Sequence, residues 1–215
     1  MLDTRFPRFV GDVGNPASFD YPVRYHTVPR ATPQAIVLDD PRPWVDAFIS
    51  AGRQLVAEGC TGLATTCGFL TLLRDEVSEA CGVPVAASAL EQVASIARAL
   101  PNAQVPGILT ISKISLSPAH LAAGGVPQGV PIQGVDGGHF AQAILSNASE
   151  LNVDTARTEM VAGAKELCDR HPDVGAIVLE CTNMPPYASA ISEATGRPVY
   201  SILTHLNRFH GTLSA

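Results

Sequence analysis

The sequence has few charged residues and no long apolar run. Charged side chains make up 16% of its 215 residues, and the net charge is −6. Such a surface does not attract the phosphates of nucleic acid or of anionic lipid, so we expect neither as a partner. No apolar run approaches the roughly 20 residues of a membrane helix, and the first ten residues lack the basic and apolar parts of a signal peptide. We therefore expect a cytoplasmic protein.

The five cysteines include no CxxC pair, and the six histidines form no HExxH motif. This pattern indicates neither a disulfide framework nor a zinc site. Glycine-rich nucleotide motifs and the GxSxG nucleophile motif are also missing. A pyridoxal phosphate enzyme needs a Schiff-base lysine, whereas the two lysines, Lys113 and Lys165, are expected at a strand end and on a solvated helix face. We expect no metal and no cofactor.

The sequence does contain a short internal repeat, in which nearly the same phrase of nine residues occurs twice. "VSEACGVPV" occupies residues 77–85 and "ISEATGRPV" occupies residues 191–199, and Cys67 and Cys181 share the same offset of 114 residues. In each copy a helical pattern stops at a glycine and a proline opens the next strand. Shared packing alone would explain the phrase, but it would not explain the matched cysteines.

Alternating strand and helix patterns predict an α/β fold with parallel sheets. We expect a short strand that runs into a Gly-rich turn over residues 8–15, and strands over residues 22–29, 61–67, 83–88, 107–112, 130–136, 175–181 and 197–203. We expect helices over residues 42–60, 70–81, 89–101 and 153–171 and before Gly196. The repeat predicts two similar Rossmann-like lobes related by a pseudo-twofold axis, with the active site in the cleft between them. The lobes would span residues 1–103 and 104–203, with the tail 204–215 packing back on the first lobe.

Cys67 and Cys181 each follow a predicted strand, at the edge where parallel α/β sheets bind ligands. The start of the next helix carries a partial positive charge, which predicts a lowered thiol pKa. Two facing lobes would place the thiols on opposite sides of one small molecule. One thiolate would then remove the proton next to a carboxylate, and the opposite thiol would return a proton to the other face.

The charge that builds on the carboxylate during this step needs preorganised hydrogen-bond donors. The candidate substrate-binding residues are Thr65, Thr66, Gly68 and Phe69 beside Cys67, and Thr182 and Asn183 beside Cys181. Phe69 either lines an apolar pocket or packs against its own helix. The other three cysteines, Cys60, Cys81 and Cys168, lack the strand-to-helix context and are expected to be structural.

The segments "TTCGF", "LECTNMPP" and "GDVGNP" resemble the cofactor-independent aspartate/glutamate racemase superfamily, and the resemblance spans essentially the whole chain. It implies two Rossmann-like lobes and one catalytic cysteine from each, at Cys67 and Cys181. It also implies substrate contacts at Asn15 and Thr182. The superfamily includes amino-acid and hydantoin racemases, maleate isomerase and arylmalonate decarboxylase, and the presence of both cysteines argues against a decarboxylase of that type.

The chain departs from the amino-acid racemases at both cysteines. Gly68 and Phe69 stand where those enzymes typically have Asn and Thr, and Glu180 stands where they have Gly. Recognition of an α-ammonium group therefore loses support. The sequence leaves open the roles of five further polar residues, namely Asp12, Lys113, His139, Glu180 and His205.

The leading interpretation is a cofactor-independent racemase or epimerase of an amino acid or amino-acid derivative. A second interpretation is a maleate-type isomerase, or another isomerase or lyase of the same superfamily. A third is a non-catalytic protein that binds a small carboxylate. The substrate, the stereochemical preference and a possible homo-oligomer stay open.

Overall fold

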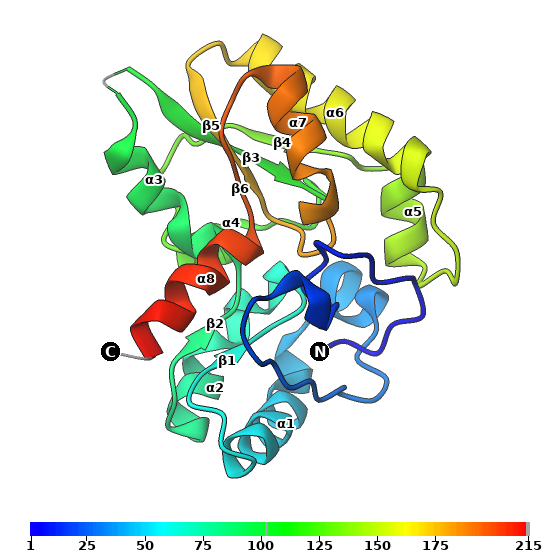
Figure 1. The fold of residues 1–215 in the computed structure, drawn as a ribbon, viewed down its shortest axis with the longest axis vertical. Helices are drawn as coiled ribbons and strands as arrows, with labels where there is room; N and C mark the ends of the chain where they lie inside the picture. The colour runs from blue at the N-terminus through cyan, green and yellow to red at the C-terminus, as the bar shows by residue number, and fades with distance from the viewer. Residues whose placement is uncertain (102, 214–215) are drawn as a thin grey trace.

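The computed structural model describes residues 1–101 and 103–213 (Figure 1). Within these residues, one parallel sheet has four strands in the order β4-β3-β5-β6, and a second pairs β1 with β2, also in parallel. The strands are β1 (Leu63–Ala64), β2 (Val85–Ala86), β3 (Val105–Thr110), β4 (Ile132–Gly134), β5 (Val174–Leu179) and β6 (Val199–Tyr200). The α/β fold with parallel sheets is as the sequence predicts.

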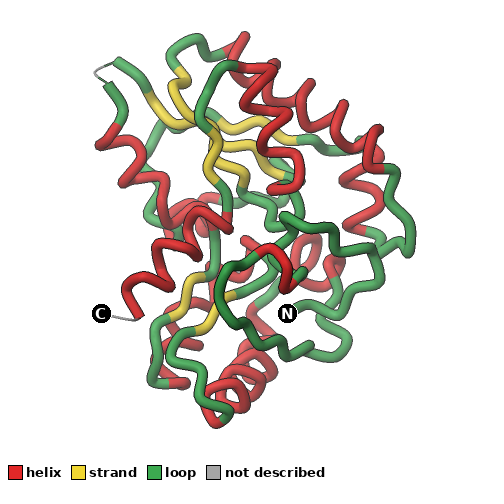
Figure 2. The backbone as a smooth tube through the Cα atoms, in the orientation of Figure 1, coloured by secondary structure: helices red, strands yellow, loops and turns green. Residues whose placement is uncertain are grey.

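The α-helices are α1 (Val45–Ala57), α2 (Arg74–Cys81), α3 (Val93–Ala99), α4 (Pro118–Ala123), α5 (His139–Leu145), α6 (Val153–Arg170), α7 (Ala188–Thr195) and α8 (Ile202–Leu213). Short 3-10 helices lie at Pro16–Ser18, Arg42–Trp44, Gly68–Leu73, Ala89–Gln92 and Pro185–Tyr187, and a π-helix lies at Gln34–Asp39. Figure 2 shows the larger sheet between α3 on one side and α6 and α7 on the other. The strand β5 is buried along its whole length, so the sheet is the centre of the core.

The repeated phrase forms the same local structure twice. In the first copy α2 ends at Gly82 and leads to β2, and in the second α7 ends at Gly196 and leads to β6. Both glycines adopt the left-handed conformation, with φ of 69° and 67°. Glycine adopts this conformation without the steric cost that other residues have, so it ends both helices.

Two expected strands of the first half are wrong. Residues 8–15 form the expected turn, in which Asp12 donates its backbone N–H to Phe9 and Asn15 donates its own to Asp12, but no strand precedes it. Residues 22–29 run without strand structure, and Pro22 and Pro29 at their ends lack a backbone donor. The last expected strand, residues 197–203, is also shorter than predicted, because α8 already begins at Ile202.

The final helix returns to the first half of the chain. Helix α8 contacts β2 and the 3-10 helix at Ala89–Gln92. Its side chains Phe209 and Leu213 lie against Gly62, so closely that a side chain at that glycine would collide with them. None of the described helices is both long and apolar enough to span a bilayer.

Candidate functional site

Cys67 and Cys181 line one cavity, although they come from opposite halves of the chain. Both side chains are almost fully buried, with 7% and 6% of their surface exposed. The cavity volume is about 20 Å³, which is room for about one water molecule. Its walls also include Thr66, Gly68, Phe69, Glu180, Thr182 and Asn183, and further residues at Leu2, Phe6, Arg8, Pro33, Val37, Ile111, Ile144 and Leu145.

The cavity lies at the topological switch point of the larger sheet, where the order of the strands reverses. Strand β3 leads outward to β4, whereas β5, which pairs with β3, leads the other way to β6. Ligands of open α/β sheets bind outside the carboxyl ends of the strands at such a point. Ile111 follows β3 directly, and Glu180 and Cys181 follow β5, so all three reach the cavity from this edge.

Hydrogen bonds tie the two cysteine segments to each other and to the amino-terminal turn. Thr182 donates its hydroxyl hydrogen to the backbone carbonyl of Thr66 at 2.7 Å. The thiol of Cys181 donates to Oδ1 of Asn183 at 3.7 Å, and Nδ2 of Asn183 donates to Asp12 at 2.6 Å. Thr182 and Asn183 therefore fix the Cys181 segment, the first against the Cys67 segment and the second against Asp12.

The expected lowering of the thiol pKa values is wrong for both cysteines. Burial raises the pKa of Cys67 to about 12, and the charge of Glu180 adds to the shift. Burial followed by the same charge also raises the pKa of Cys181 well above its usual value. Backbone amides do favour the thiolates, those of Phe69 and Leu70 at Cys67 and that of Asn183 at Cys181, but desolvation is the larger effect.

Glu180 brings a third proton-carrying group to the cavity. Its side chain is completely buried, and Oε2 accepts a hydrogen bond from Thr110 at 2.8 Å. The other oxygen, Oε1, has no hydrogen-bond partner among the described residues. Burial raises the pKa of this carboxyl to about 7. The arrangement can thus take up, hold and release protons at three neighbouring atoms, two sulfurs and one oxygen.

Arg8 lines the cavity from the amino-terminal segment, and Asp12 of the same segment holds it in place. Arg8 donates to Asp12 at 2.9 Å and to Thr4 at 3.0 Å, and Asp12 also accepts from the backbone of Gly14 at 2.7 Å. Asp12 therefore holds its own turn and orients Asn183. Nε of Arg8 is buried and has no hydrogen-bond partner among the described residues.

Several residues singled out in the sequence lie outside the cavity. The side chain of Asn15 bonds to Arg8 and Ala17, and the hydroxyl of Thr65 faces the carbonyls of Cys67 and Ala87. The remaining polar candidates are also engaged elsewhere: Lys113 through its backbone with Asp136, His139 with Asn152 and Glu159, and His205 with Glu91. The substrate contacts expected at Asn15 and Thr65 stay predictions.

Two residues of the site, Arg8 and Thr110, are not among the candidates that the sequence predicts. Arg8 stands four residues before Asp12, a spacing of opposite charges that indicates a local pair, and this signal was available. Thr110 gives no such signal, because its bond to Glu180 depends on β3 lying beside β5 in the sheet. The residues of a strand do not indicate which other strand will lie beside it in a parallel sheet.

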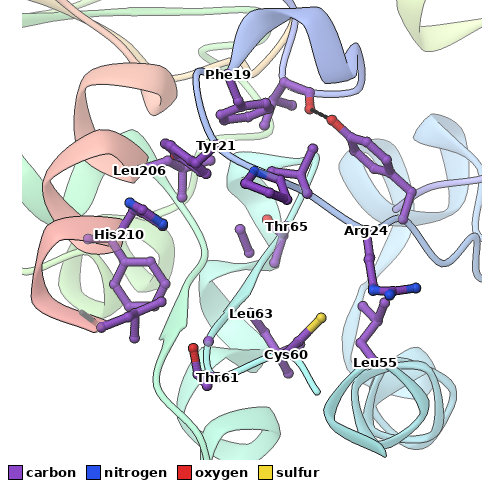
Figure 3. Close-up of a pocket in the computed structure, with 18 of the residues that line it drawn as sticks. Phe19, Tyr21, Arg24, Leu55, Cys60, Thr61, Leu63, Thr65, Leu206 and His210 are labelled. Carbon is purple, nitrogen blue, oxygen red and sulfur yellow. Dashed lines mark hydrogen bonds between the residues drawn. The ribbon is translucent and has the colours of Figure 1, made fainter. Parts of the chain in front are cut away.

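A second, larger pocket is lined by neither Cys67 nor Cys181. Its volume is about 350 Å³, and Figure 3 shows it between Tyr21 and His210 on one side and Arg24 and Leu55 on another. The rings of Tyr21 and His210 stack with their centroids 3.8 Å apart. Thr66 is the one residue that lines both this pocket and the cysteine cavity. Cys60 lines the larger pocket, and the described residues contain no cluster of three His, Cys, Asp or Glu side chains suited to a metal ion.

Comparison with known proteins gives matches to a set of lyases over nearly all of this chain. The chain is 30% identical over 219 residues to a dimethylsulfoniopropionate lyase of Durusdinium sp. clade D, covering 97% of this chain and 71% of that protein. It is also 30% identical over 226 residues to dimethylsulfoniopropionate lyase 7 of Emiliania huxleyi, covering 99% of this chain and 65% of the relative. The chain thus spans about two thirds of the length of these relatives. No protein-family model matches it.

Solved structures share the fold. Allantoin racemase from Pseudomonas fluorescens aligns with a TM-score of 0.60 at 19% identity, over 81% of this chain and 70% of that one. Arylmalonate decarboxylase aligns with a TM-score of 0.54 at 15% identity, over 82% of this chain and 78% of that one. These matches confirm the expected fold, with two Rossmann-like lobes.

Proposed function

This chain belongs to the family of the dimethylsulfoniopropionate lyases, within the aspartate/glutamate racemase superfamily, and on that premise we propose that it is a lyase acting on dimethylsulfoniopropionate or a close analogue. The observation that carries the proposal is the pair of cysteines from opposite halves in one buried cavity. A pair of thiols around one ligand would support proton removal from a carbon next to its carboxylate.

The reaction is a β-elimination. A cysteine thiolate takes the proton of the carbon next to the carboxylate, and the electron pair of that C–H bond forms a carbon–carbon double bond. The bond from the β-carbon to the sulfonium sulfur breaks, and dimethyl sulfide leaves with its electron pair. Acrylate remains, and one proton is released overall.

Cys67 is the candidate base. Its sulfur is favoured as a thiolate by two backbone amides, those of Phe69 and Leu70, whereas the thiol of Cys181 already donates its hydrogen to Asn183. Burial that raises a thiol pKa also makes the thiolate a stronger base once it forms. Nε of Arg8 is a candidate donor to the substrate carboxylate, whose charge grows as the proton leaves.

Substrate entry requires movement of the cavity walls. A cavity of about 20 Å³ holds roughly one water and is too small for a ligand of several heavy atoms. The wall includes the amino-terminal residues Leu2 and Phe6 from one side and Ile144 from the other. Closure around the substrate would then exclude water from the thiolate.

The second candidate function is the racemase or epimerase of an amino acid or derivative that the sequence predicts. The observation in its favour is that each half supplies one cysteine, as proton removal from one face and return to the other requires. No cofactor is part of either proposal.

One experiment separates the candidates. Purified protein is incubated in D₂O with dimethylsulfoniopropionate, amino acids, hydantoins and dicarboxylates in turn. Dimethyl sulfide release supports the lyase, and deuterium at the α-carbon of recovered substrate supports the racemase. Cys67→Ala and Cys181→Ala should each abolish activity, while Cys168→Ala, on helix α6 outside the cavity, serves as the matched control. Full activity in both cavity variants would refute the cysteine mechanism.

A further inference from the structure

We propose that Glu180 is the proton acceptor of the cavity, which takes the thiol proton of a cavity cysteine and so generates the thiolate. This inference rests on the proposed cysteine chemistry. The carboxyl is completely buried, and Oε1 has no hydrogen-bond partner among the described residues, although a buried oxygen without a partner is costly. A catalytic role is one explanation of such a buried, unpaired oxygen.

The chain makes room for this oxygen beside the cysteines. A side chain at Gly68, the residue after Cys67, would place its Cβ 2.2 Å from Oε1 of Glu180. Only a glycine leaves space for the carboxyl there. The glycine at residue 68 and the buried carboxyl at residue 180 are therefore sterically linked.

The groups that face Glu180 can be named. The other titratable or charged residues of the cavity wall are Cys67, Cys181 and Arg8, and Arg8 is paired with Asp12. Glu180 is the foremost charge acting on either sulfur. Thr110 holds Oε2, which leaves Oε1 as the free oxygen.

The proton transfer is balanced within the cavity. The S–H bond of Cys67 breaks, its electron pair stays on sulfur, and the proton forms an O–H bond with Oε1. A neutral carboxylic acid and a thiolate result, so the net charge of the closed site does not change. A lyase needs this step in every turnover, because the thiol acquires the substrate proton and elimination returns none to the product. The proton leaves Glu180 when the cavity opens for product release.

The pH profile of catalysis tests the proposal. In the native protein kcat should rise through pH about 7, where Glu180 loses its proton, and then stay flat. In Glu180→Gln the thiol must lose its proton to solvent, so kcat should fall about 100-fold at pH 7 and rise about tenfold per pH unit from 7 to 9. Glu180→Asp keeps a carboxyl, so its profile of kcat against pH should again rise and then level off. The exposed Glu150→Gln is the matched control.

A substrate-free readout separates failure of this proposal from failure of the proposed function. Alkylation by iodoacetamide is followed against pH at Cys67 and Cys181 separately by mass spectrometry. The rate at the reactive cysteine should be flat above pH about 7 in the native protein and should climb steadily in Glu180→Gln. Parallel profiles in the two proteins would overturn the proposal, whichever substrate is turned over. A higher KM in Glu180→Gln with unchanged kcat and unchanged pH profile would also overturn it and assign Glu180 to the substrate cation.

Discussion

Thr182 donates its hydroxyl hydrogen to the backbone carbonyl of Thr66, at a distance of 2.7 Å. Thr66 precedes Cys67 and Thr182 follows Cys181, so one hydrogen bond joins the two segments that carry the sulfurs. Both residues are buried, with 6% and 1% of their surface exposed. The spacing of the two thiols thus depends on a contact between residues 116 positions apart in the chain.

Removing this hydrogen bond should lower both stability and catalysis. Thr182→Val keeps the side-chain shape but leaves a buried carbonyl without its partner, at a cost of about 1–3 kcal/mol. Loss of alignment between the sulfurs should lower kcat by roughly 100-fold. The control is Thr195→Val, outside the cavity, whose hydroxyl donates to the carbonyl of Ile191 and accepts from the backbone N–H of Arg197. Urea denaturation and steady-state kinetics give the two numbers, and equal activity in both variants would contradict the expectation.

Alanine at Gly68 should be damaging. The added methyl group would meet Oε1 of Glu180 at 2.2 Å and the carbonyl oxygen of the same residue at 2.8 Å. We expect Gly68→Ala to destabilise the protein by about 1–3 kcal/mol and to abolish activity. Gly211→Ala has open space and lies in helix α8, so it should stabilise the protein by up to about 1 kcal/mol. Thermal denaturation of both variants would show the opposite signs.

Glu180 should make stability depend on pH. Its pKa is raised from 4.5 to about 7, so the folded state binds more protons than the unfolded state between these values. The contribution of Glu180 is fully present below pH 4.5 and is lost as pH rises through 7, by about 3 kcal/mol in all. The buried amino group of Met1, with its pKa lowered to about 6, acts in the opposite direction. The difference between native protein and Glu180→Gln, measured by urea denaturation from pH 4 to pH 8, isolates Glu180, and a constant difference would be the contrary result.

Asp12 should be needed for both folding and activity. It holds Arg8, Gly14 and Asn183 together and is only 3% exposed. Asp12→Ala leaves the Arg8 charge without its partner, which should cost about 3–5 kcal/mol. The exposed pair of Asp40 and Arg42 is the comparison, and Asp40→Ala should leave the denaturation midpoint unchanged. A small effect of Asp12→Ala would mean that solvent reaches Arg8.

Much of the fold was predictable because its signals are local. The helices α1, α2 and α6 follow from apolar spacing, and the left-handed glycines Gly82 and Gly196 follow from the repeated phrase. The expected strands at 8–15 and 22–29 failed because a strand needs a partner beside it. Alternation of residues shows which segments can be extended, but not whether a neighbouring strand is present to pair with them.

The two cysteines and their matched settings can be identified from the order of residues alone. Their electrostatics cannot, because these depend on how the chain folds around them. A helix start next to Cys67 predicts a lowered pKa, yet burial raises it to about 12, because desolvation depends on all the atoms packed around the sulfur. The same is true of Glu180, whose free oxygen results from Thr110 on a neighbouring strand and Gly68 in the other half. Residue types and their order are local properties, whereas burial and charge sum over atoms that only the folded chain brings together.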